Sequence, residues 1–162
     1  MSDLYLIALG SNRRHHIHGA PGSTLRAAME ELAALGTVRK RSPIMSSAPM
    51  GSALRRFANA ACAIESERDP LELLRGLKRI ESDFGRRPGR RWGDRVLDLD
   101  IVLWSGGTFR APSLTIPHPA FRARHFVLRP AVQVAPDWRD PTTGRTVRQL
   151  DARLTAARPL PR

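Results

Sequence analysis

The chain has 162 residues, 41% of them hydrophobic, and a formal net charge of +12 at pH 7. This length favours one domain with an ordinary apolar core and leaves no room for a second catalytic domain. No stretch approaches the roughly 18 apolar residues of a membrane span, and the first residues lack the pattern of a signal peptide. The positive charge indicates a polyanionic partner, which could be a nucleic acid, a nucleotide or a phosphorylated metabolite. We expect a cytoplasmic protein.

Apolar runs separated by turn residues predict the elements of the first half. They indicate a strand at 4–9, a helix at 24–35, a strand at 37–45 and another at 57–66. Ser23 is placed to cap the first helix. The loop before this helix carries histidines at 15, 16 and 18, which we expect to be solvated because no carboxylate or thiol accompanies them. The single cysteine, Cys62, has no partner, which suits a reducing compartment and a small core residue.

The second half begins with the clearest helix, predicted at 69–85, with Asp69 as its cap. An arginine-rich loop follows, then a strand at 96–104 and a region punctuated by prolines. The order strand, helix, strand, strand, helix, strand predicts an α+β sandwich of the ferredoxin-like, split-βαβ kind, with an antiparallel-rich sheet and helices packed on its faces. We expect one domain over 1–150 and a frayed tail at 151–162.

Two aspartates interrupt the strand at 96–104. Because side chains alternate along a strand, Asp98 and Asp100 should share one face, with their Cα atoms roughly 7 Å apart. The other face should carry Leu97, Leu99, Ile101 and Leu103. Two carboxylates this close repel unless cations neutralise them. Arginine could supply that charge, as could Mg²⁺, which prefers oxygen ligands. An ordinary solvent-facing strand with two acids is the alternative.

Arginines surround this pair in the sequence. Arg91 and Arg95 precede it, and Arg122 and Arg124 follow the segment "PHP" some twenty residues later. Carboxylates for magnesium beside arginines for phosphate are what nucleotide-dependent phosphoryl transfer requires. The glycine loop of a P-loop is missing. The context therefore favours a phosphoryl-transfer site over a solvated acidic strand.

Six segments, in order, resemble one known family: "LGSN" (9–12), "FANA" (57–60), "RIESDFGR" (79–86), "RWGDRVLDLDI" (91–101), "LTIPHP" (114–119) and "RHFVLRP" (124–130). The chain resembles the 6-hydroxymethyl-7,8-dihydropterin pyrophosphokinases, folate-pathway enzymes that move a pyrophosphoryl group from ATP to a pterin alcohol. The resemblance covers nearly the whole chain and implies one catalytic domain of this type. Asp94, Lys78 and Ser113 depart from the family's usual pattern.

The resemblance implies roles for individual residues. Two Mg²⁺ ions fall on Asp98 and Asp100, and Arg91 and Arg95 join them as catalytic residues. ATP is the co-substrate, and its contacts fall on Glu81, Arg86, Arg91, Arg95, Ile101, Thr115, His118 and Arg124. The pterin pocket maps to Ser47, Ala48, Met50, Phe57, Asn59, Trp92 and Phe126. Phe57 and Phe126 can supply aromatic faces for a flat ring, and Asn59 can both donate to and accept from its edge.

The implied reaction is attack of the pterin hydroxymethyl oxygen on the β-phosphorus of ATP, with AMP leaving. We expect a monomer whose partners are these small molecules, and neither nucleic acid nor a membrane. Two alternatives stay open. Ferredoxin-like sheets with basic surfaces also bind RNA, although the aromatic strand motif of such modules is missing here. A diverged relative could also bind pterin or nucleotide without turnover.

Overall fold

The computed structural model of the chain describes residues 1–12, 15, 17–47, 57–85 and 96–156. Its main sheet has the order β2-β4-β1-β5, and every neighbouring pair is antiparallel. The strands are β1 (Asp3–Ser11), β2 (Thr37–Arg41), β4 (Phe57–Ser66) and β5 (Asp98–Trp104), and the short β3 (Met45–Ser47) also pairs with β4.

Two helices connect strands that are not neighbours in the sheet. Helix α1 (Pro21–Glu31), continued by a 3₁₀ turn at Leu32–Ala34, leads from β1 to β2, and β4 lies between those strands. Helix α2 (Pro70–Gly85) leads from β4 to β5, and β1 lies between them. These are two split βαβ units, so the predicted ferredoxin-like α+β sandwich is confirmed.

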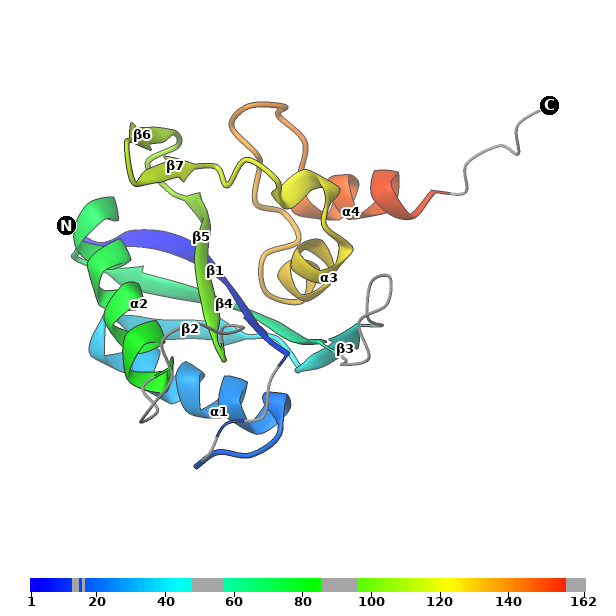
Figure 1. Cartoon of the computed structure of the whole chain (residues 1–162). Helices are drawn as coiled ribbons and strands as arrows, with labels where there is room; N and C mark the ends of the chain where they lie inside the picture. The colour runs from blue at the N-terminus through cyan, green and yellow to red at the C-terminus, as the bar shows by residue number, and fades with distance from the viewer. Residues whose placement is uncertain (13–14, 16, 48–56, 86–95, 157–162) are drawn as a thin grey trace.

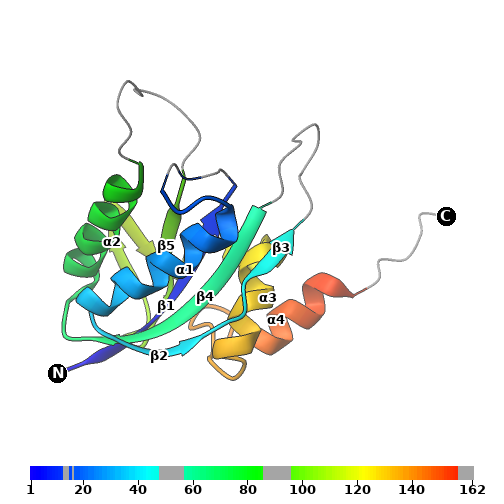
Figure 2. The ribbon, with the colours of Figure 1, turned by 90° about the horizontal axis from the view of Figure 1, so that it is seen from below.

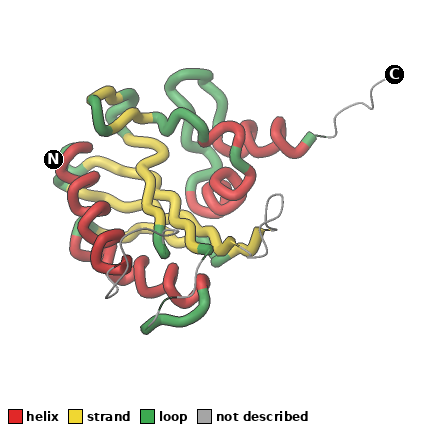
Figure 3. The backbone as a smooth tube through the Cα atoms, viewed as in Figure 1, coloured by secondary structure: helices red, strands yellow, loops and turns green. Residues whose placement is uncertain are grey.

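Helices cover both faces of the sheet. Helices α1 and α2 lie on one face, and α3 (His125–Val134) and α4 (Val147–Thr155) lie on the other, as Figures 1 and 2 show. A separate hairpin, β6 (Phe109–Ala111) with β7 (Leu114–Ile116), and a 3₁₀ turn at Phe121–Ala123 connect β5 to α3 (Figure 3). None of the helices in the described part of the chain combines the length and apolar character needed to cross a bilayer.

The central position of β1 in the sheet explains why the sequence of this strand is apolar without alternation. Tyr5, Ile7 and Leu9 pack in the cluster under α1 and α2, whereas Leu6 packs in the cluster under α3 and α4. A strand buried on both faces needs apolar residues at every position. Cys62 is fully buried in the α1–α2 cluster, as expected of a small core residue.

Several boundaries differ from those predicted. Helix α1 begins at Pro21, and its N-cap residue Ala20 makes no side-chain hydrogen bond, so the prediction that Ser23 caps this helix is wrong. Proline suits a first turn because the N–H it lacks has no partner there anyway. The strand predicted at 37–45 is divided into β2 and β3 around Pro43, which cannot donate to a ladder. Asp69 does cap α2, since its Oδ1 accepts from Glu72 N at 2.9 Å.

The end of the chain is more regular than expected. Residues 151–155, assigned to the tail from sequence, complete α4, which buries Val147 and Leu150. A capping box starts this helix: Thr146 Oγ1 accepts from Gln149 N at 3.1 Å, and Gln149 Oε1 accepts from Thr146 N at 2.9 Å. Residues 157–162 lie outside the described residues.

A β-bulge changes the faces of β5. Ile101 lies opposite Ile7, but Leu103 lies opposite Leu6, so Val102 is an extra residue in this strand. Leu103 therefore packs under α3 and α4, while Ile101 packs under α1 and α2. The prediction that Leu103 shares a face with Leu99 and Ile101 is wrong, because strict alternation holds only until the bulge.

Candidate active site

The face of the sheet toward α3 and α4 carries a row of polar residues. Gly10 of β1 lies opposite Asn59 of β4 on one side and opposite Asp98 of β5 on the other. Directly opposite residues of antiparallel strands point to the same face. A Cβ atom on Gly10 would lie 3.5 Å from Oδ1 of Asn59, so this amide extends over the glycine. Gly10 thus lies directly under the amide of Asn59, at the centre of this polar row.

Asp100 is the next residue of β5 on this face. It lies opposite Ala8, which packs against the α3–α4 cluster, and both aspartates are half-buried. Leu99, between them, is fully buried on the other face. The predicted sharing of one face by Asp98 and Asp100 is therefore confirmed.

His118 lies near Asp100 and is held by two backbone groups. The backbone N–H of His118 donates to the carbonyl of the bulge residue Val102 at 3.0 Å. The ring Nδ1 accepts from Ala120 N at 3.1 Å. Burial lowers the pKa of His118, and although Asp100 opposes this, the guanidinium of Arg124 lowers the pKa further. The neutral ring with an accepting Nδ1 carries its proton on Nε2. His118 can therefore donate a hydrogen bond to an oxygen of a ligand.

Arg124 and Phe126 lie where the 3₁₀ turn meets α3. Arg124 is the N-cap residue of α3, and its guanidinium carbon lies 5.6 Å from the centre of the Phe126 ring. This distance is within the range of a cation–π contact. Phe126 is 40% exposed, which is unusual for a large apolar side chain and leaves much of its ring available to a ligand.

The second expected aromatic face comes from another element. Phe57 is the first residue of β4, is half-buried and lies opposite Ser47 of β3. It shares its face of the sheet with Asn59, two positions further along the strand. Helix α3, which carries Phe126, packs on β4. The expected pterin residues that the structure describes therefore come from β3, β4 and α3.

Glu81 has a structural role that the sequence did not predict. Its Oε2 accepts from Leu99 N at 2.8 Å, and its Oε1 lies 3.0 Å from Nζ of Lys78. β5 is an edge strand, so the outward N–H of Leu99 has no strand partner. Glu81 thus ties α2 to the strand that carries both aspartates. An edge strand cannot be recognised before the strand order is known, so the sequence did not predict this hydrogen bond.

Two further expected ATP contacts lie near β5. Ile101 is 2% exposed and belongs to the α1–α2 cluster, so only its backbone is available to a ligand. Thr115 lies on β7 and is half-buried. The remaining predicted site residues lie outside the described part of the chain: Ala48, Met50, Arg86, Arg91, Trp92 and Arg95.

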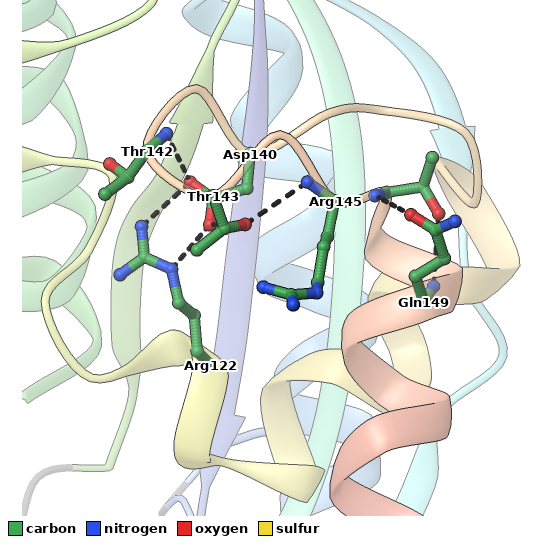
Figure 4. A network of polar contacts seen from close by, with 7 residues as sticks. Arg122, Asp140, Thr142, Thr143, Arg145 and Gln149 are labelled. Carbon is green, nitrogen blue, oxygen red and sulfur yellow. Dashed lines mark hydrogen bonds and ion pairs between the residues drawn. The ribbon is translucent and has the colours of Figure 1, made fainter.

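Arg122 was expected to serve phosphate binding together with Arg124, but it makes a structural ion pair. Its Nε and Nη2 donate to the two carboxylate oxygens of Asp140 at 2.6 and 2.8 Å, as Figure 4 shows. Asp140 is fully buried and also accepts from Thr142 N at 3.0 Å and Thr143 Oγ1 at 2.7 Å. These hydrogen bonds and the Arg122 charge outweigh burial and lower the pKa of Asp140 to about 2. The pair attaches the loop before α4 to the turn between His118 and Arg124.

The histidine loop differs from its prediction at His15, whereas His18 is exposed as expected. His15 is 5% exposed, not solvated, and its Nδ1 accepts from Ile17 N at 3.0 Å and His18 N at 3.1 Å. The rings of His15 and His18 pack against Phe84 of α2, with centroids 5.6 and 5.2 Å away. His16 lies outside the described residues. Among the described side chains, no three His, Cys, Asp or Glu residues come together as a metal site.

Solved structures resemble the chain in fold. The wild-type HPPK-DHPS of Plasmodium falciparum matches 94% of this chain with a TM-score of 0.73, at 13% identity and over 41% of its own length. At this identity the likeness supports the fold alone, the α+β class with an antiparallel sheet described above.

Sequence comparison gives the family. The model of the 7,8-dihydro-6-hydroxymethylpterin-pyrophosphokinase (HPPK) family matches residues 6–136. A 2-amino-4-hydroxy-6-hydroxymethyldihydropteridine pyrophosphokinase of Methylorubrum extorquens is 38% identical over 95% of this chain and 94% of its own. The protein of the same name from Pseudomonas aeruginosa is 39% identical over 83% and 82%, and that of Synechocystis 38% over 78% and 66%. The chain belongs to the HPPK family, whose members transfer pyrophosphate from ATP to hydroxymethyldihydropterin in folate biosynthesis.

Proposed function

We propose that this chain catalyses the family's reaction, transferring pyrophosphate from ATP to 6-hydroxymethyl-7,8-dihydropterin and releasing AMP, at the sheet face described above. One observation supports this location for the reaction. The register of β4, β1 and β5 aligns Asn59, Gly10 and Asp98 across one face of the sheet, with Asp100 next to them. An amide for a heterocycle and two carboxylates for a metal thus lie on a common floor.

The donor set suits magnesium. Asp98 and Asp100 supply only carboxylate oxygens, and no thiol or third metal-binding side chain joins them among the described residues. Mg²⁺ is commonly held by one or two carboxylates and completes its shell with water and phosphate oxygens. We therefore assign two Mg²⁺ ions to this pair. When bound, they would neutralise charge on the transferring phosphates and orient the attacking and leaving oxygens.

The other described residues bind the pterin, the phosphates and the nucleoside. Asn59 donates to and accepts from the edge of the pterin, and the exposed ring of Phe126 stacks on its face, with Phe57 on the other side. His118 donates from Nε2 to a phosphate oxygen, and its neutral state avoids a second positive charge beside Arg124. Arg124 offsets negative charge that develops on the phosphates. Thr115 and the backbone of Ile101 contact the nucleoside end of ATP.

Residues outside the described part complete the proposal. Arg91 and Arg95 act as phosphate clamps, Arg86 contacts ATP, and Ala48, Met50 and Trp92 line the pterin pocket together with Ser47. Glu81 contacts ATP in addition to its bond to β5. We also propose that the protein acts in the cytoplasm as a monomer and binds no nucleic acid.

The test is release of AMP from ATP in the presence and absence of 6-hydroxymethyl-7,8-dihydropterin, with Mg²⁺ supplied and then removed by a chelator. We expect AMP only with pterin and Mg²⁺ together. Pterin and nucleotide binding without AMP release would instead identify a diverged relative that does not turn over. If RNA bound tightly while ATP did not, the alternative of an RNA-binding module would be correct.

A further inference from the structure

A pocket of about 490 Å³ lies between the β6–β7 hairpin and the loop before α4. Its apolar part includes Ile116 and Pro117, and its polar part consists of arginine and threonine side chains. The polar lining residues include Arg110, Thr115, Arg122 and Thr142. No carboxylate belongs to the lining of this pocket within the described chain. Such a lining suits an electron-rich or anionic group rather than a cation.

The register of the hairpin directs Arg110 and Thr115 to one side. These two residues lie directly opposite each other, so their side chains share a face of the hairpin. Their neighbours Phe109 and Ile116 also form a pair; Ile116 belongs to the apolar cluster under α1 and α2, and Phe109 packs against it. Arg110 therefore lies beside a residue of the proposed ATP site without contributing to the core.

Some arginines in the described part of the chain are held by carboxylates, and Arg110 is not one of them. Arg122, on the same pocket, is bound through both Nε and Nη2 to the buried Asp140, and Arg41 and Arg148 pair with Glu30 and Asp137. Arg110 is exposed and makes no ion pair with a described residue. Its donors are available to an incoming ligand at no cost of breaking an internal pair.

We propose that Arg110 is a further nucleotide-binding residue, which donates to an oxygen of the sugar–phosphate part of ATP beside Thr115. The inference rests on the proposed function, since Thr115 is a contact of ATP in that proposal. A guanidinium presents several N–H donors in one plane and forms short, charge-assisted bonds to phosphate oxygens. Arg122 serves as a fixed wall of the pocket, whereas Arg110 provides the adaptable contact and contributes to the affinity for ATP.

The experiment compares three variants with the unaltered protein: Arg110→Ala, Arg110→Lys and Arg153→Ala. Arg153 is an exposed arginine in the last turn of α4, so its removal controls for the loss of one positive charge. We expect Arg110→Ala to raise the KM for ATP about 5- to 20-fold with little change in kcat or in the KM for pterin, as when uniform binding is lost. Arg110→Lys should recover part of the affinity, and Arg153→Ala should behave as the unaltered protein.

Binding of a non-hydrolysable ATP analogue, measured by calorimetry at fixed ionic strength, separates this inference from the proposed function. If the unaltered protein binds the analogue and releases AMP, but Arg110→Ala binds it equally well, the role of Arg110 is wrong and the function stands. The same holds if Arg153→Ala weakens binding as much as Arg110→Ala, because general charge is then responsible. If the unaltered protein neither binds the analogue nor releases AMP, both proposals fail.

Discussion

The two faces of the sheet are built from the same strands but differ in composition. Toward α1 and α2, β1, β4 and β5 present apolar residues along their length, and these form one continuous buried cluster. Toward α3 and α4, the same strands are apolar only over part of their length, where Leu6, Ala61 and Leu103 pack. Beyond that part they present Asn59 and the two aspartates.

The two faces therefore have different roles: one stabilises the fold, and the other carries the reacting groups. The face toward α1 and α2 can hold the fold without contributing a polar group to the site. At its polar end, the face toward α3 and α4 needs fewer apolar contacts for stability. It can therefore present carboxylates beside a glycine and an alanine. Substitutions on the first face should therefore change the free energy of unfolding, and substitutions at the polar end of the second should change activity.

The largest expected effect is that of Asp100→Asn on activity. This change keeps the shape of the side chain but removes a charge that Mg²⁺ needs, so AMP release should fall by several orders of magnitude. The melting temperature without Mg²⁺ should stay the same or rise slightly, because two carboxylates on one face repel. The pKa of His118 should fall further, since Asp100 raises it in the unaltered protein; NMR of its ring would measure this. An active or strongly destabilised variant would contradict the metal role.

The opposite pattern is expected for Leu25→Ala on the other face. Leu25 is fully buried between α1 and the sheet, so truncation should lower the free energy of unfolding by about 2–5 kcal/mol. Turnover per folded molecule should stay close to that of the unaltered protein at a temperature where both are folded. Denaturant unfolding and AMP release measure the two quantities. If turnover fell as strongly as in Asp100→Asn, the separation between the faces would not hold.

Asp140→Asn should reduce stability through the pair with Arg122. Because Arg122 is 28% exposed, we expect the free energy of unfolding to fall by about 3 kcal/mol, the lower end of the cost of breaking a buried pair. The folded pKa of Asp140 is about 2, below its value in the unfolded chain, so its contribution is complete above about pH 4 and is lost as pH falls through 2. The difference in stability between the two proteins should therefore shrink over this range. A difference independent of pH would show that the charge of Asp140 is unimportant.

Phe126→Ala tests the exposed ring of the second face. Losing its apolar and stacking area should weaken pterin binding by roughly 1–3 kcal/mol while leaving the binding of ATP alone nearly unchanged. Because Phe126 is 40% exposed, the melting temperature should change little. Fluorescence titration with the pterin measures the first effect. Unchanged affinity would place the ring of the ligand elsewhere.

The sequence by itself predicted the elements with strong periodicity. The spacing of apolar residues in α2 and the apolar run of β1 depend on neighbours along the chain, so they can be recognised without a fold. The order of elements also sufficed for the ferredoxin-like class. The shared face of Asp98 and Asp100 followed from alternation alone, since the two residues precede the bulge.

Only the tertiary structure decided the features that depend on distant partners. The bulge at Val102 arises where β5 pairs with β1, and it moved Leu103 to the other face. Glu81 bonds to Leu99 because β5 is an edge strand, and Arg122 is bound by Asp140, eighteen residues away. His15 is buried because Phe84 lies beside its loop. Each of these depends on strand order or on packing between segments far apart in the chain, which periodicity along a sequence does not contain.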